Sequence, residues 1–111
     1  MTTEEFLEFK KEIAQRSYDI CKQKNADYTA DSGNAFKNFM MVEEMGICST
    51  EDGFLTRMTD KMMRVTSFVK KGTLEVKSES VEDTLMDLSN YAELFMGYLK
   101  WKRESKHLRC G

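Results

Sequence analysis

Three residues with oxygen-bearing side chains recur along one stretch of the chain at the spacing of a helix face. Asp83, Asp87 and Asn90 are separated by intervals of four and three residues. At about 100° per residue these intervals place the three side chains on one side of a helix. Carboxylate and amide oxygens are the ligands that hard cations such as Mg²⁺ prefer. The spacing therefore predicts a row of oxygen ligands on this helix.

An apolar stripe follows a different side of the same stretch. It recurs at helical spacing and consists of Leu85, Leu88, Ala92, Phe95 and Leu99. We expect this side to form the core. The side begun by the polar row continues as Leu94, Tyr98 and Trp101, so the C-terminal half of the helix is apolar on two sides. One small bundle would struggle to cover both, which predicts a subunit interface and a homo-oligomer, a dimer or larger.

A second group of charged residues lies in the segment 51–71, on the side away from its apolar residues. Asp60 and Arg64 are four residues apart and are able to pair on the helix surface. Alternatively, Asp60 binds a metal ion while Lys61 and Arg64 contact phosphate. The sequence leaves both interpretations open.

Two further places carry groups that could face a ligand. Glu43 and Glu44 are adjacent near a predicted helix C-terminus, where negative charge opposes the helix dipole. This pair fits either an exposed surface or a cation site. Asp27 and Tyr28 belong to the run NADYTADSGN, whose composition is typical of a loop. They either face a ligand or belong to a solvated connection.

The elements that must position these residues are predicted to be helices throughout. The chain contains no proline, and its apolar residues recur with the 3.6-residue period of a helix. Thr2 with Glu5, Ser49 with Asp52, and Ser80 with Asp83 have the spacing of helix N-terminal caps, and Gly46 and Gly72 are natural stops. The predicted helices span 2–24, 35–45, 51–71 and 80–98, with a loop over 25–34 and a basic tail over about 100–111. We expect one all-α, four-helix bundle-like domain covering 1–111 and completed by oligomerisation.

Composition excludes several classes of protein. Seventeen Lys and Arg residues against nineteen Asp and Glu give a net charge of −2, which argues against a dedicated nucleic-acid-binding protein. No run approaches the roughly 20 apolar residues of a membrane span. Three widely spaced cysteines fit free thiols in a reducing compartment, so we expect a cytoplasmic protein without membrane partners. The one histidine, His107, lies in the basic tail, which argues against nucleophilic triads and histidine-rich zinc chemistry.

Three runs of sequence together resemble a known family. They are KNADYTADSGNAFKNF (24–39), FLTRMTDKMMRV (54–65) and ESVEDTLMDLSNYA (79–92), and they cover roughly two thirds of the chain. They resemble a small phage and bacterial nucleotide-modification-associated domain that is similar to the MazG-like all-α nucleoside triphosphate pyrophosphohydrolases. The last run is the most specific of the three. A phage-encoded member would work in the host cytoplasm.

The resemblance implies an oligomeric helical bundle that binds Mg²⁺ and nucleotides and releases pyrophosphate from them. Carried over position by position, it implies that the catalytic and metal-binding residues are Glu44, Asp60, Asp83 and Asp87. It also implies that the nucleotide is contacted by Asp27, Tyr28, Asn38, Lys61, Arg64 and Asn90.

The chain departs from the signatures of that superfamily at two places. Glu43 and Glu44 are not followed by a third glutamate three residues later, and Asp83 and Asp87 are four rather than three residues apart. Three functions therefore stay open. The first is Mg²⁺-dependent pyrophosphohydrolysis of a nucleoside triphosphate or related phage or host nucleotide. The second is binding without cleavage, which would sequester a cyclic or signalling nucleotide, and the third is a helical interaction protein.

Overall fold

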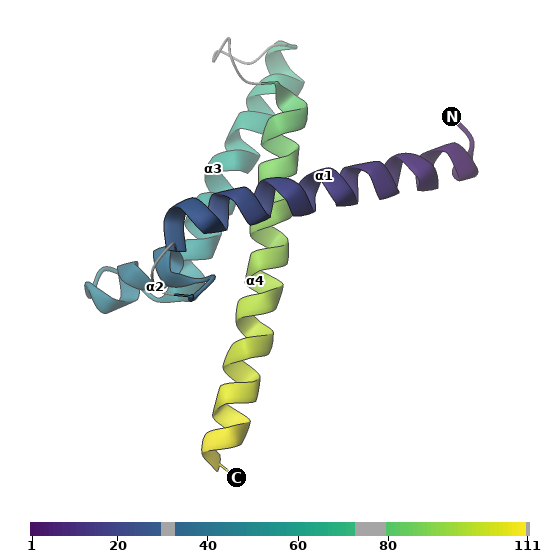
Figure 1. Cartoon of the computed structure of the whole chain (residues 1–111). Coiled ribbons are helices and arrows are strands. Elements are labelled where there is room, and N and C mark those ends of the chain that lie inside the picture. Colours follow the sequence, from purple (N-terminus) through teal and green to yellow (C-terminus); the bar gives the residue numbers. More distant parts are fainter. Residues whose placement is uncertain (30–32, 73–79, 111) are drawn as a thin grey trace. The chain divides into compact units, whose positions relative to one another are not determined.

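The described part of the chain is all-α, as the sequence predicts. The computed structural model describes residues 1–29, 33–72 and 80–110, and the side chains of 1–24, 33–72 and 80–105. Within these residues every element is a helix (Figure 1): α1 (Thr3–Thr29), α2 (Lys37–Glu44), α3 (Thr50–Lys71) and α4 (Val81–Cys110). The chain divides into two compact units, residues 1–35 and 36–111, which are described separately below.

The unit of residues 1–35 contains α1. Thr2 caps its N-terminus, because the Thr2 hydroxyl accepts a hydrogen bond from the Glu5 amide at 3.1 Å, and the same hydroxyl donates one to the Glu5 carboxylate at 3.2 Å. Three large apolar side chains near this end of the helix, Phe6, Leu7 and Phe9, are each about half exposed.

Helix α1 is longer than predicted. We expected a loop from residue 25, but the helix continues to Thr29, so Asp27 and Tyr28 belong to its backbone. Asn and Asp cost only a few tenths of a kcal/mol inside a helix, and no Gly or Pro stops the chain before Gly33. The side chains of Asp27 and Tyr28 lie outside the described residues.

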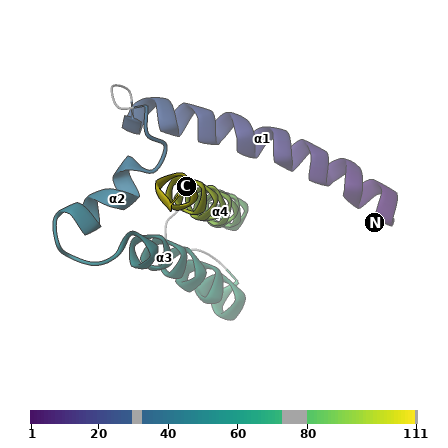
Figure 2. The same ribbon diagram turned by 90° about the horizontal axis from the view of Figure 1, so that it is seen from below.

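The unit of residues 36–111 is built on α3 and α4, which lie side by side in both views (Figures 1 and 2). Contacts between Glu51 and Lys102 at one end and between Lys61 and Asp87 further along show that the two helices run antiparallel. Helix α2 packs on α3. Gly53 permits this contact, because a Cβ there would lie 3.0 Å from Val42 Cγ2 and 3.3 Å from the Phe39 carbonyl oxygen.

Stacked aromatic rings form the core of this unit. Phe54 of α3 is fully buried between Phe39 of α2, whose ring centroid is 4.0 Å away, and Phe95 of α4, at 4.8 Å. The three rings are nearly parallel. Tyr98 closes the cluster, with its ring centroid 5.6 Å from that of Phe54. The aromatic residues therefore fix how α2, α3 and α4 meet.

The ends of α3 and α4 agree with the predicted caps. Ser49 accepts a hydrogen bond from the Asp52 amide at 3.0 Å, and Gly72 ends α3 with φ of 78°, a left-handed conformation that favours glycine. At its other end, however, α4 differs from the prediction. The expected basic tail is helical through Cys110. Its Lys, Arg, Glu and Leu residues are good helix formers, and cations near a helix C-terminus are favourable.

The side of α4 that faces its neighbours also differs from the prediction. We expected the stripe of Leu85, Leu88, Ala92, Phe95 and Leu99 to form the core. Phe95 does join the ring stack, but Leu85 and Leu99 are exposed, whereas Asn90 and Tyr98 on the other side are buried. The reason is that the aromatic rings and the ion pairs described next bind that other side to α3.

Candidate functional site

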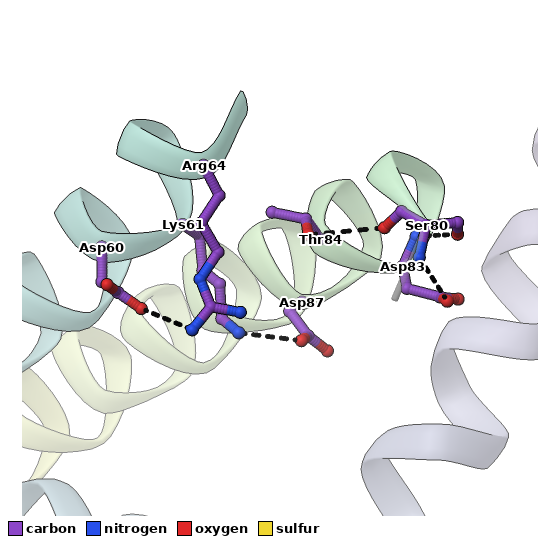
Figure 3. Close-up of polar contacts among 7 residues, drawn as sticks. All are labelled: Asp60, Lys61, Arg64, Ser80, Asp83, Thr84 and Asp87. Atoms are coloured by element: carbon purple, nitrogen blue, oxygen red, sulfur yellow. Dashed lines mark hydrogen bonds and ion pairs between the residues drawn. The ribbon is translucent and has the colours of Figure 1, made fainter. Parts of the chain in front are cut away.

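The candidate site is a row of four charged side chains between α3 and α4, here called the charge row: Asp60, Arg64, Lys61 and Asp87. Arg64 lies four residues after Asp60 and three residues after Lys61, so its side chain is next to both on the surface of α3. Asp87 comes from α4. Figure 3 shows the cationic ends of Lys61 and Arg64 next to each other, with one carboxylate on either side.

The central contact of the charge row is the ion pair between Lys61 and Asp87. Lys61 Nζ lies 3.2 Å from Asp87 Oδ2, and the side chains are only 13% and 19% exposed. Little water remains around these charges, so their attraction is screened less than that of a surface pair. This contact joins α3 to α4 through one of the predicted nucleotide contacts and one of the predicted metal ligands.

The second contact of the charge row is more open. Arg64 Nη2 lies 3.5 Å from Asp60 Oδ2, and the side chains are 38% and 61% exposed. This is the i,i+4 pairing that the sequence left as one of two alternatives. Because an exposed pair of this kind contributes little to stability, the Arg64 guanidinium can exchange its carboxylate for another anion at low cost.

Asp83 serves the start of α4. Its amide donates to the Ser80 hydroxyl at 3.1 Å, and its carboxylate accepts from the Ser80 amide at 3.3 Å, which is a capping box (Figure 3). The fully buried Thr84 donates from its hydroxyl to the Ser80 carbonyl at 3.4 Å. Asp83 is therefore one turn from Asp87 along α4, but its carboxylate already has a structural role.

The remaining predicted site residues lie outside the charge row. Asn90 is buried on α4, one turn beyond Asp87. Asn38 is partly buried on α2, and Glu44 is exposed at the end of that helix. The structure thus brings together Asp60, Lys61, Arg64 and Asp87.

The four predicted metal ligands do not assemble into one group. Within the described residues, no three His, Cys, Asp or Glu side chains lie close enough together to hold one metal ion. Carboxylate oxygens suit Mg²⁺ chemically, but Asp60 and Asp87 contact cationic side chains and Asp83 caps a helix. Among the described residues, these carboxylates therefore do not form one group of three metal ligands.

A second polar cluster was not predicted from the sequence. It lies where α2 and α3 meet α4, and it consists of Glu43, Thr50, Glu51, Tyr98 and Lys102. Lys102 Nζ lies 2.9 Å from Glu51 Oε2, the Tyr98 hydroxyl donates to Glu51 Oε1 at 3.4 Å, and the Thr50 hydroxyl donates to Glu43 Oε2 at 3.3 Å. Nothing local in the sequence relates residues 51 and 102, so only their distance in space reveals this cluster.

The contacts of the second polar cluster shift three pKa values. The hydrogen bond from Lys102 lowers the pKa of Glu51, and the same bond raises the pKa of Lys102. Burial raises the pKa of the Tyr98 hydroxyl, and the nearby negative charge of Glu51 raises it further, while a hydrogen bond with Thr50 acts in the opposite direction. Tyr98 is therefore held in its neutral form.

Two other features were expected from composition. Neither Cys21 nor Cys48 is in a disulfide, and the side chain of Cys110 is outside the described residues. In the part of the chain that the structure describes, no helix has an apolar stretch long enough to cross a membrane.

Comparison with known proteins gives no relative for this chain. No protein-family model matches it, and neither a curated protein nor a solved structure matches it.

Proposed function

We propose that this protein binds a nucleotide through its phosphate groups at the charge row. The observation that carries the proposal is the ion pair of Lys61 and Asp87, which is largely shielded from water and lies beside the more open pair of Arg64 and Asp60. The cationic groups of Lys61 and Arg64 lie next to each other where α3 contacts α4. The resemblance of the sequence to nucleotide-processing helical proteins supports the same interpretation.

Phosphate chemistry fits the two cationic side chains. A guanidinium donates two parallel hydrogen bonds to phosphate oxygens, and an ammonium acts as a compact point charge. Lys61 and Arg64 are three residues apart on α3, so one phosphate chain is able to contact both. In the structure, Asp87 and Asp60 contact these cations. Binding would therefore exchange carboxylate partners for phosphate partners.

Such an exchange would also release two carboxylates. Mg²⁺ is usually bound by one or two carboxylates together with substrate phosphates, rather than by a complete set of protein ligands. Asp60 and Asp87 would then lie beside a Mg²⁺ ion that arrives with the nucleotide. This observation favours a second candidate function, the Mg²⁺-dependent release of pyrophosphate from a nucleoside triphosphate, which leaves a monophosphate.

The binding experiment compares variants of the two cations with a matched control. Calorimetric titration would use a panel of nucleoside triphosphates and cyclic oligonucleotides, with and without Mg²⁺. Lys61→Met and Arg64→Met are each expected to weaken binding by roughly tenfold or more, because each removes a charge-assisted hydrogen bond. Lys70→Met is the control, since Lys70 is an exposed lysine in the last turn of the same helix.

Equal affinity of all three variants and the wild-type protein would contradict the assignment to the charge row. If no member of the panel binds, the third open function, a helical interaction protein, would be favoured. Circular dichroism of each variant would verify that its helices are intact.

The product of the incubation separates the two candidate functions. Recovery of intact nucleotide from the denatured protein would identify a protein that sequesters its ligand. A monophosphate that forms only with Mg²⁺, and that is lost in Asp87→Asn, would identify a pyrophosphohydrolase. Asp52→Asn is a suitable control, because Asp52 is an exposed aspartate in the first turn of α3.

A further inference from the structure

Helix α4 leaves an apolar stripe exposed on the side away from the second polar cluster. This stripe, here called the α4 outer stripe, consists of Leu85, Leu88, Ala92, Met96 and Leu99. Leu85, Met96 and Leu99 are 46%, 69% and 38% exposed, and the other two are partly buried. It runs for about 21 Å along the helix at 1.5 Å per residue. An exposed apolar surface of this kind is typical of a protein–protein contact.

The spacing of the α4 outer stripe is symmetric about its middle residue. Leu85 and Leu99 each lie seven residues from Ala92, and Leu88 and Met96 each lie four residues from it. When two identical helices pair antiparallel, residues at equal distances before and after the twofold axis meet. An axis at Ala92 would therefore bring leucine against leucine at both ends of the stripe and the smallest side chain to the crossing point.

The charges at the two ends of α4 are complementary in the same arrangement. The first turn carries the exposed carboxylate of Glu82. The segment after the stripe carries the exposed cations Arg103 and Lys100, the latter 3.3 Å from the carboxylate of Glu104 on the same helix. An antiparallel pair places each acidic end beside the basic segment of the other copy. A parallel pair would place like charges together. The opposed helix dipoles add a small favourable contribution.

We propose that the α4 outer stripe binds a second copy of the chain, with the two α4 helices antiparallel around a twofold axis at Ala92. The contact is isologous, so the same residues contribute from both copies and the assembly closes at two subunits. A stripe of this length offers less than the roughly 800 Å² per partner of a standard interface. The dimer is therefore expected to depend on protein concentration.

The first test is sedimentation velocity over a wide range of concentration. Met96→Glu places a charge in the stripe, and it is expected to raise the dissociation constant at least tenfold, because an unpaired carboxylate would be buried in the contact. Met63→Glu is the control, since Met63 is 66% exposed against 69% for Met96 but lies on α3. Circular dichroism would show that both variants stay helical.

The second test fixes the register. In a chain with Cys21, Cys48 and Cys110 changed to serine, Ala92→Cys is expected to form a disulfide between two copies under mild oxidation. Ser89→Cys is the control, because two copies of residue 89 would be about 9 Å apart along antiparallel helices, beyond disulfide reach.

Three results would overturn the proposal. One is a wild-type protein that sediments as a monomer at every concentration. Another is an unchanged dimer in Met96→Glu, which would place the contact elsewhere. A disulfide at residue 89 instead of residue 92 would exclude this register.

Discussion

At the scale of single residues, the ion pair of Lys61 and Asp87 has the most informative position in the unit of residues 36–111. It joins α3 to α4 at a place where the side chains are mostly shielded from water. A shielded ion pair favours the packing of α3 on α4 that keeps its two charges in contact. Any other packing would leave a charge without its partner, and solvent would not fully compensate that charge. The pair therefore contributes to the fold as well as to the proposed phosphate site.

The first prediction concerns this pair. Lys61→Met should lower the free energy of unfolding by about 2 kcal/mol, because the Asp87 carboxylate loses the ammonium of Lys61 in a poorly hydrated position. The double variant Lys61→Met with Asp87→Leu should recover part of this loss. Urea denaturation would measure the single variants Lys61→Met and Asp87→Leu and the double variant, with Lys70→Met as a surface control. Strict additivity of the two single changes would show that the residues are not coupled.

The second prediction concerns Tyr98. Burial raises the pKa of its hydroxyl above the ordinary value of 10.0, so the folded state favours the neutral form more than the unfolded state does. The stabilisation is fully present below about pH 10 and is lost as the pH rises through the higher pKa of the folded protein. Tyr98→Phe should therefore show a weaker loss of thermal stability above pH 10 than the wild-type protein.

Thermal unfolding followed by circular dichroism from neutral to strongly alkaline pH would test this. Parallel pH curves for Tyr98→Phe and the wild-type protein would contradict it. At the acid end, the lowered pKa of Glu51 means that its contribution is present above its ordinary pKa of 4.5 and is lost as the pH falls below it. The carboxylate is substantially exposed, so this effect is small.

At the scale of elements, the contact between α2 and α3 depends on a glycine. A methyl group at Gly53 would lie 3.0 Å from Val42 Cγ2 and 3.3 Å from a backbone oxygen of Phe39. Backbone atoms cannot move aside without shifting α2. The ring stack of Phe39 and Phe54 sits in this same contact, so a shift of α2 would disturb the core.

The third prediction uses two glycines in helices. Gly→Ala inside a helix ordinarily stabilises by roughly 0.5–1 kcal/mol. Gly97→Ala should follow this rule, because its methyl group would lie 3.4 Å from the Phe36 ring, an ordinary contact distance. Gly53→Ala should instead destabilise the fold by about 1 kcal/mol or more through overpacking. Chemical denaturation of the two variants would show opposite signs, and the same sign in both would disprove the argument.

At the scale of the whole molecule, the two proposals use different surfaces of α4. The charge row includes Asp87 on the side that faces α3, whereas the α4 outer stripe includes Met96 on the exposed side. A nucleotide and a second copy of the chain would therefore not compete for the same side chains. Loss of the dimer in Met96→Glu with unchanged nucleotide affinity would show that the two functions are separate.

Much of the local structure follows from the sequence alone. The capping residues Thr2, Ser49 and Ser80 and the stop at Gly72 are found where predicted, because each makes contacts with residues only a few positions away. The all-α class follows from the helical period of the apolar residues. The extension of α1 past residue 24 and of α4 past residue 98 was missed, since polar residues are tolerated in helices and only Gly or Pro stops them firmly.

Tertiary structure decided which side of α4 is buried and which candidate site residues meet. In the sequence, two sides of α4 carry apolar residues in similar number, and the spacing alone does not predict which of the two sides is buried. The choice comes from contacts across the chain, since Phe54 contacts Tyr98 and Lys61 pairs with Asp87 only when α3 lies on that side. The same contacts separate Asp83 from the charge row, because long-range packing, unlike helix periodicity, is set by shape and charge complementarity between distant segments.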